Sequence, residues 1–180
     1  MGEHRPYIAL IGNPNSGKTA IFNLLTGMNL KVSNYPGITV EMRLGTSRIS
    51  SNQTIEIMDL PGTYSLTPES MDEKIVAQET FRWMGEEDKP QAIISVVDAS
   101  NLTRNLYLTS QLLELDIPIV VALNMMDRVR YREYDIDSEA LRKSLGVAAV
   151  IPMSAREKWG IIELKEALVD MGKNTHLPLA

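Results

Sequence analysis

The residues with the clearest chemical meaning form the run from Gly12 to Thr19, which reads Gly-Asn-Pro-Asn-Ser-Gly-Lys-Thr and fits the pattern GxxxxGK[ST]. A loop of this pattern turns backbone N–H groups toward nucleotide phosphates, its Lys adds a positive charge, and its Thr hydroxyl is a magnesium ligand. The apolar run from Tyr7 to Ile11 precedes it, and a helix starting at the second glycine points its positive end at the same phosphates. The sequence therefore predicts a phosphate site in which Lys18 supplies the charge and Thr19 binds magnesium.

A second motif, Asp59-Leu60-Pro61-Gly62, closes an expected strand. A carboxylate at this point reaches the magnesium shell, and the Gly62 amide faces the γ-phosphate. Asp before Pro-Gly on its own indicates only a turn. Because this strand is expected beside the phosphate loop, we interpret Asp59 as a second magnesium ligand.

Two further motifs indicate which base is bound. Asn124-Met125-Met126-Asp127 follows an apolar strand, and Ser154-Ala155-Arg156 follows the next strand along the chain. The Asp127 carboxylate accepts hydrogen bonds from the ring N–H and the exocyclic amine of guanine, whereas adenine has no such pair of donors. Asn124 would brace the loop and approach the other edge of the base, and a backbone amide of the Ser154 motif would meet the guanine oxygen. The sequence predicts guanine specificity.

The elements that must position these motifs alternate between short β-branched runs and longer segments of helical period, which is typical of a mostly parallel sheet flanked by helices. We expect strands at 7–11, 41–49, 54–59, 92–98, 118–124 and 150–154, and helices at 17–26, 70–84, 102–115, 137–145 and 160–171. The polar turn at 50–53 is too short for a helical crossover and predicts an antiparallel hairpin. The expected fold is α/β with three layers and a six-stranded mixed sheet, one strand being antiparallel. Ligands of such sheets lie at the carboxyl ends of the strands.

Composition narrows the class of protein. The chain has 180 residues, no Cys and a net charge of −5, which suits a reducing compartment and disfavours nucleic acid as a partner. No apolar run reaches the ~18 residues of a membrane span.

Two segments, 27–38 and 61–69, are rich in Gly, Pro, Ser, Thr and Asn and are expected to be loops. We expect one domain over 1–172 and a tail over 173–180.

The four motifs, taken in order, resemble the guanine-nucleotide-binding G domain of the Ras-like and translation-factor families. A closer resemblance, to the N-terminal G domain of the ferrous iron transport protein B (FeoB) family within the TrmE-Era-type GTPases, is carried by the runs Val32–Glu41, Asp59–Leu66 and Val97–Leu113. The most specific piece is DASNLTRNLYLTSQLLEL, because no general GTPase constraint demands it. The resemblance implies a GTPase on the cytoplasmic side of the inner membrane that acts as a switch for iron uptake. It also implies a following helical spacer, which the tail would begin, a polytopic iron-permease region, and a homo-oligomer in the full-length protein.

The resemblance further implies roles for individual residues. Thr39 would be the first-switch threonine that meets magnesium and the γ-phosphate, and Asn15 would coordinate a potassium ion that bridges the phosphates. Asn15, Lys18, Thr39 and Gly62 would then be the catalytic residues, with Thr19, Thr39 and Asp59 holding magnesium. The residues expected to contact GTP or GDP are Asn13, Pro14, Asn15, Ser16, Gly17, Lys18, Thr19, Ala20, Asn34, Tyr35, Pro36, Gly37, Ile38, Thr39, Asp59, Gly62, Asn124, Met125, Asp127, Ser154, Ala155 and Arg156.

Two positions depart from the general GTPase pattern. Thr63 stands where Ras-like proteins have a Gln that orients the attacking water, so we expect slow hydrolysis unless the potassium ion supplies charge stabilisation. Met125 stands where many G domains have a Lys, so we expect modest affinity for the nucleotide.

Two other functions remain open at this point: a free-standing Era- or TrmE-type GTPase that assists RNA modification or ribosome assembly, and a nucleotide-responsive binding module with negligible turnover.

Overall fold

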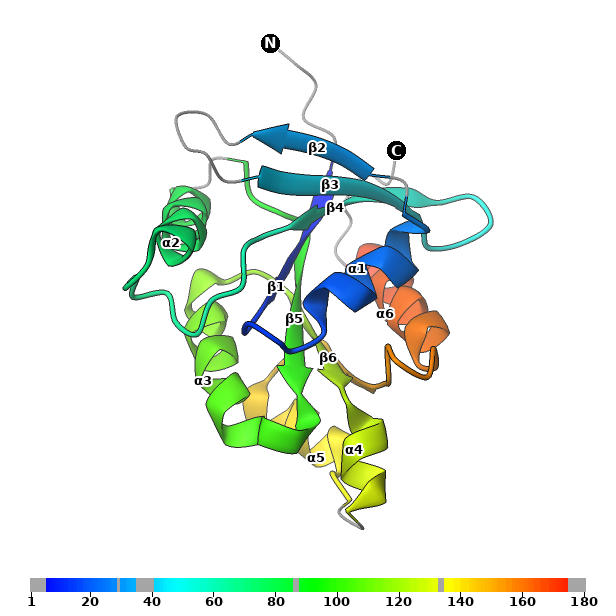
Figure 1. Ribbon diagram of the computed structural model, residues 1–180. Helices are drawn as coiled ribbons and strands as arrows, with labels where there is room; N and C mark the ends of the chain where they lie inside the picture. Colours follow the sequence, from blue (N-terminus) through cyan, green and yellow to red (C-terminus); the bar gives the residue numbers. More distant parts are fainter. Residues whose placement is uncertain (1–5, 29, 35–40, 86–87, 133–134, 175–180) are drawn as a thin grey trace.

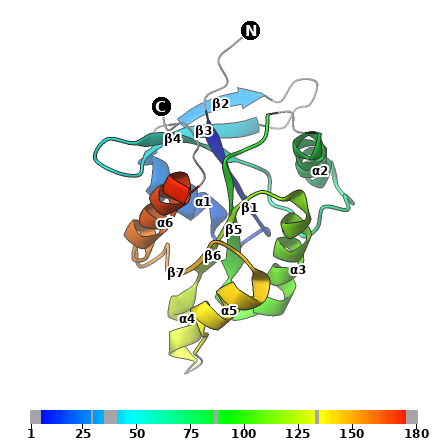
Figure 2. The same cartoon turned by 180° about the vertical axis from the view of Figure 1, so that it is seen from behind.

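The structure is a computed structural model that describes residues 6–28, 30–34, 41–85, 88–132 and 135–174. Within these residues one sheet of seven strands has the order β2-β3-β4-β1-β5-β6-β7. Helices α1 and α6 cover one face, and α2 and α3 cover the other (Figures 1 and 2). The strands are β1 Tyr7–Gly12, β2 Leu30–Asn34, β3 Glu41–Arg48, β4 Thr54–Asp59, β5 Ala92–Asp98, β6 Ile119–Asn124 and β7 Ala149–Pro152, and the α-helices are α1 Lys18–Thr26, α2 Met71–Met84, α3 Leu102–Leu112, α4 Met126–Tyr131, α5 Ser138–Leu145 and α6 Ile161–Asn174.

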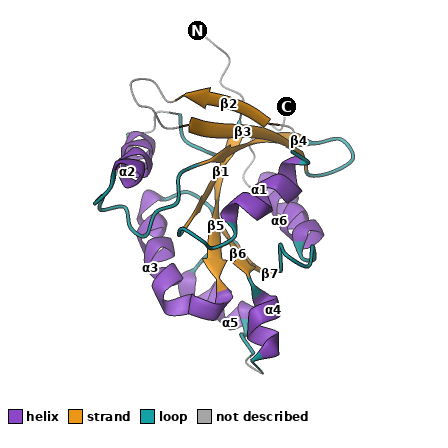
Figure 3. Ribbon diagram, viewed as in Figure 1, coloured by secondary structure: helices purple, strands orange, loops and turns teal. Residues whose placement is uncertain are grey.

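The predicted α/β class and its three layers are confirmed (Figure 3). The expected hairpin is β3 paired antiparallel with β4, while β1 pairs parallel with both β4 and β5. One expectation needs correction, because the sheet has a seventh strand. Strand β2 lies inside 27–38, which was expected to be a loop, and it pairs antiparallel with β3. Its polar composition gave no strand signal, and pairing with a neighbour decided its conformation.

The centre of the sheet is apolar on both faces, as expected for parallel strands covered by helices on each side. Every residue of β1 and of β6 is buried. On one face the strands pack against Phe22 and Leu25 of α1 and Leu164 of α6. On the other face they pack against Trp83 of α2 and Leu108 of α3, and the buried Met126 and Val129 of α4 belong to the same cluster. This two-sided core fixes the strands whose ends carry the motifs.

The register of the strands brings the motifs to one edge. Leu10 of β1 lies opposite Asp59 of β4, and Asp98 of β5 lies opposite Asn124 of β6. The phosphate loop, the aspartate motif and the base motif therefore leave the sheet side by side. Helix α4, which begins at Met126 within the base motif, was missed because its six residues are too few to show a helical period. Among the described residues, no helix is long and apolar enough to cross a membrane.

Candidate nucleotide-binding site

The phosphate loop connects the carboxyl end of β1 to the first turn of α1. Asn15 and Gly17 have φ angles of 64° and 87°, which the short side chain of Asn tolerates and Gly adopts freely. A Cβ on Gly17 would lie 2.2 Å from Nδ2 of Asn124, so only Gly allows the loop to approach the base motif so closely. The loop therefore presents its backbone to the cavity at the start of α1.

Lys18 and Asp59 face each other at the centre of this edge. The Lys18 ammonium forms an ion pair with the Asp59 carboxylate, and both side chains are nearly buried, with exposed fractions of 10% and 7%. A buried charge is tolerated when it is paired. A nucleotide phosphate with bound magnesium complements both groups, because the phosphate oxygens match the ammonium and the metal ion matches the carboxylate.

A cavity of about 640 Å³ opens beside this pair. It is lined by Asn13, Pro14, Asn15, Gly17, Lys18, Thr19, Ala20, Asn23, Gly62 and Asp72. The side chains of Asn15 and Thr19 are exposed in it, whereas the Asn13 amide and the Ser16 hydroxyl are buried without a hydrogen-bond partner. Buried polar groups ordinarily have partners, and hydroxyl, amide and ammonium groups beside a helix N-terminus suit phosphate oxygens. The donor set fits a nucleotide phosphate and its magnesium ion.

The base motif is joined to the phosphate loop through Asn124. Its Nδ2 donates to the Ser16 carbonyl at 2.9 Å, and its Oδ1 accepts from the backbone N–H of Ala155 at 2.9 Å. The Asn124 side chain is 2% exposed, so both hydrogen bonds are shielded from water. One side chain thus fixes the phosphate loop, the end of β6 and the turn after β7 relative to one another.

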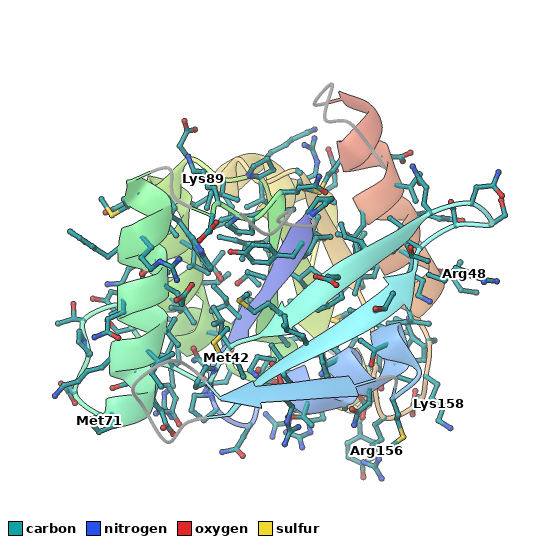
Figure 4. The ribbon with its side chains drawn as sticks, turned by 90° about the horizontal axis from the view of Figure 1, so that it is seen from above. Met42, Arg48, Met71, Lys89, Arg156 and Lys158 are labelled. Atoms are coloured by element: carbon teal, nitrogen blue, oxygen red, sulfur yellow. The ribbon has the colours of Figure 1, made fainter. Side chains whose placement is uncertain are left out.

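Asp127 and the turn after β7 form a second group of residues, called here the base wall, which Asn124 joins to the phosphate loop. The Ser154 hydroxyl donates to Oδ1 of Asp127 at 2.8 Å, and the Ala155 N–H is engaged by Asn124. Met125, with φ of 63°, turns the chain from β6 into α4. Arg156 is exposed and points outward from the turn (Figure 4). The second carboxylate oxygen of Asp127 remains available to a ligand.

Gly62 and Thr63 close the site from the side of β4. The Thr63 N–H donates to the Gly12 carbonyl at 3.1 Å, and a Cβ on Gly62 would lie 3.2 Å from the backbone of Pro14. The Thr63 side chain is buried, and its hydroxyl donates to the Ser65 carbonyl at 2.7 Å. The hydroxyl at the position of the missing Gln is therefore directed into the protein.

The remaining predicted contacts are in the first switch. Asn34 is the last residue of β2, and the structure describes its backbone but not its side chain. Tyr35, Pro36, Gly37, Ile38 and Thr39 all lie outside the described residues.

Sequence reasoning missed the residues that hold the segment after Gly62. The Glu73 carboxylate accepts hydrogen bonds from the N–H groups of Glu69 at 2.9 Å, Ser70 at 3.1 Å and Tyr64 at 3.3 Å. The spacing Ser70-x-x-Glu73 is a capping box that the sequence contains. Backbone N–H groups, of Glu69 first and Tyr64 second, hold the pKa of the Glu73 carboxyl below its usual value. Ionised Glu73 therefore orders residues 64–70.

Replacement of Glu73 by Gln tests this role. At pH 7 we expect the Glu69 and Ser70 amides to exchange hydrogen about 2- to 10-fold faster than in the unmutated protein, the effect of losing one such hydrogen bond. Because the pKa of Glu73 is lowered in the folded protein, the protection is present above the usual carboxyl pKa and disappears as the pH falls through the lowered value. The variant should lack this pH dependence. Exchange measured by NMR and corrected for intrinsic rates is the assay.

The matched control is Glu114→Gln, which neutralises an exposed carboxylate that accepts none of the hydrogen bonds from the Tyr64, Glu69 and Ser70 N–H groups. Equal exchange in the Glu73 and Glu114 variants would show that Glu73 does not order residues 64–70.

Comparison with known proteins supports the interpretation that a nucleotide binds at the carboxyl ends of these strands. The family description "Ferrous iron transport protein B" matches residues 6–168. The Fe(2+) transporter FeoB of Legionella pneumophila (strain Paris) is 48% identical over 164 residues, which cover 89% of this chain and 21% of that protein. The chain spans about a fifth of the length of the curated relatives that it matches.

Solved structures agree in fold. A GDP-bound mutant of the S. thermophilus FeoB G-domain is 41% identical, with a TM-score of 0.83 over 97% of this chain and 64% of that one. The cytosolic domain of the T. maritima FeoB iron transporter in its GMPPNP form is 37% identical, with a TM-score of 0.84 over 92% of this chain and 63% of that one. The predicted Ras-like G-domain fold is confirmed. Because the family match covers most of its length, the chain belongs to the ferrous iron transport protein B family.

Proposed function

We propose that this domain binds GTP and hydrolyses it to GDP and phosphate, as the cytosolic switch of a ferrous iron transporter. The observation that carries the proposal is the pair of hydrogen bonds made by the Asn124 side chain, which fixes the phosphate loop relative to the base wall. Asp127, aligned by Ser154, is the group that would select guanine. The GDP and GMPPNP forms of the structural relatives support the same ligand class.

Separate residues of this chain would bind the phosphates, the magnesium ion and the potassium ion. The backbone of the phosphate loop and Lys18 would bind the phosphates, with the N-terminus of α1 adding its partial positive charge. Thr19, Asp59 and Thr39 would hold magnesium, and Asn15, exposed in the same cavity, would hold potassium. These cations, when bound, neutralise charge that develops on the phosphates. The Gly62 N–H would orient the terminal phosphate.

The direction of the Thr63 hydroxyl supports slow intrinsic turnover. It is committed to Ser65 and is also within 3.3 Å of Glu73, so it does not replace the amide that orients water in Ras-like proteins. Electrostatic stabilisation then has to come from cations in the phosphate cavity. We propose that turnover is potassium-stimulated for this reason.

The longer relatives support a place for this domain in a larger protein. We propose that it works at the cytoplasmic side of the membrane, coupled through a helical spacer to a transmembrane iron-permease region and assembled as a homo-oligomer. Family membership disfavours the RNA-directed Era or TrmE function. A binding module with negligible turnover is separated from a GTPase by the phosphate-release assay below.

Replacement of Asp127 by Asn tests the choice of base. Asn can still accept the hydrogen bond from Ser154, so the wall should keep its shape, while the pair of hydrogen bonds to guanine is lost. We expect GTP and GDP affinity to fall about 10- to 100-fold, the effect of losing a hydrogen bond to a charged group. Xanthine nucleotides, which present an oxygen in place of the guanine amine, should bind the variant better than the unmutated domain. Calorimetric titration measures both, and unchanged GDP affinity would exclude Asp127 as the base-reading group.

Exchange of potassium for sodium tests the role of Asn15. Phosphate release from GTP should be at least about 10-fold faster in potassium, in the range that one stabilising group contributes to a transition state. Asn15→Gly removes the amide and keeps the positive φ of 64° accessible, so it should abolish the difference without disturbing the loop. Asn15→Ala should do the same with added backbone strain. Equal rates in both salts for the unmutated domain would rule out potassium stimulation.

A further inference from the structure

The turn that follows β7 is closed on itself. Ser154 and Trp159 exchange two backbone hydrogen bonds of 3.2 Å each. Gly160, with φ of 85°, then leads into α6, and a Cβ there would lie 2.4 Å from Cβ of Met153. We call residues 154–159 the base turn. Its first and last residues are hydrogen-bonded to each other, so the two ends of the turn lie side by side.

The base turn contacts α4 at two points. At one point the Ser154 hydroxyl donates to the Asp127 carboxylate at 2.8 Å. At the other, the guanidinium of Arg130 lies over the ring of Trp159, with Cζ 4.3 Å from the ring centroid. Asp127 and Arg130 are three residues apart and therefore share one side of the helix. The same helix thus presents the base-reading carboxylate and, one turn further on, a cation stacked on the far end of the base turn.

The surroundings of Trp159 favour this stack. Its ring is half-buried against the apolar cluster that contains Met126 and Val129 of α4, and its Nε1 donates to the Glu157 carboxylate at 3.0 Å. A guanidinium over Trp is the strongest common form of the cation–π contact. The planar group of Arg matches the ring in a way that the ammonium of Lys does not. The basic run Arg128, Arg130, Arg132 looks like a solvated stretch in sequence, yet its middle member has a specific partner.

We propose that the stack of Arg130 on Trp159 holds the base turn against α4 and thereby sets the rate at which guanine nucleotide leaves the site. The inference rests on the proposed function, since it takes Asp127 and the base turn as the walls of a guanine pocket. With the stack in place, the turn is held at both of its ends. Without it, the Ser154–Trp159 backbone pair, the Ser154 hydroxyl contact and the hydrogen bond from the Met126 N–H to the Met153 carbonyl remain. The base turn then keeps only one of its two contacts with α4 and moves away from that helix more often. Arg130 and Trp159 are positioning residues that act through Asp127 and Ser154.

The test is the release of GDP carrying a fluorescent methylanthraniloyl group, followed in a stopped-flow instrument after addition of excess unlabelled GDP. The label is excited directly, because the variants remove one of the two tryptophans of the chain. Arg130→Ala should raise the dissociation rate about 3- to 10-fold and leave the association rate within about 2-fold. Arg130→Lys should fall between the two proteins, as should Trp159→Phe, which retains an aromatic face.

Two further variants separate the stack from a general effect. The double variant Arg130→Ala/Trp159→Ala should release GDP no faster than Trp159→Ala alone, because partners in one interaction are not additive. Arg128→Ala removes an exposed Arg from the same helix and should release GDP at the unmutated rate. A general loss of structure would lower the thermal midpoint of the nucleotide-free protein by many degrees, whereas Arg130→Ala should lower it by no more than about 4 °C, the effect of losing one such contact.

Three results would overturn the inference. Unmutated release kinetics in Arg130→Ala would do so while leaving GDP binding, and hence the proposed function, intact. Equal acceleration in Arg128→Ala and Arg130→Ala would show an effect of charge alone. Failure of the unmutated domain to bind GDP would overturn the proposed function together with this inference.

Discussion

The two hydrogen bonds of Asn124 are the constraint on which the rest of the site depends. They connect the Ser16 carbonyl in the phosphate loop with the Ala155 N–H in the base turn, two segments that lie far apart in sequence. The packing is so close that Gly17 has no room for a Cβ beside the Asn124 amide. Because the amide group is buried, water does not compete for either bond, and the loss of one partner would leave the other unsatisfied. The spacing between phosphate and base is thereby built into the fold.

The sheet fixes the relative positions of the strand ends that carry the site residues. Strands β1, β5 and β6 are parallel neighbours with apolar residues on both faces, so their carboxyl ends form a rigid row. On this row lie the phosphate loop, Asp98 and Asn124. Asp98 accepts hydrogen bonds from the backbone and hydroxyl of Ser100 and starts the connection into α3. Backbone pairing between strands therefore holds the strand ends, whereas side chains hold the segment after Gly62.

Those side chains explain the most family-specific phrase of the sequence, DASNLTRNLYLTSQLLEL. Asn105 accepts from the Asp98 N–H at 3.1 Å and donates to the Asn101 carbonyl at 3.0 Å, which shapes the start of α3. Arg104 then lies over the ring of Tyr64, 4.2 Å from its centroid, and Gln111 accepts from the Leu66 N–H at 2.9 Å. Helix α3 and Glu73 thus hold the same segment from two sides. A general GTPase pattern does not require these contacts, because they serve this segment and not the nucleotide.

Local chemistry explains which parts were predictable. The strands at 54–59 and 92–98 were predicted to the residue because the alternating Ile residues in the first, and the pairs Ile93-Ile94 and Val96-Val97 in the second, leave little ambiguity between turns. The phosphate motif is specific by its spacing. Strand β2 was not predictable, since Lys31, Ser33 and Asn34 have no strand preference and only pairing with β3 orders them. The partner of Arg130 was also hidden, because Trp159 lies 29 positions away and reaches it only once β6 and β7 pair. Interactions of this kind come from tertiary structure, which periodicity does not encode.

We infer that the phosphate loop and the base wall form one guanine-nucleotide site. Calorimetric titration of the unmutated domain with GDP and with ADP in the presence of magnesium tests it most directly, because the two ligands share every phosphate contact and differ only in the base. We expect GDP to bind at least about 100-fold more tightly than ADP, because the wrong base would leave buried polar groups of the base wall unpaired. Equal affinities for the two nucleotides would contradict it.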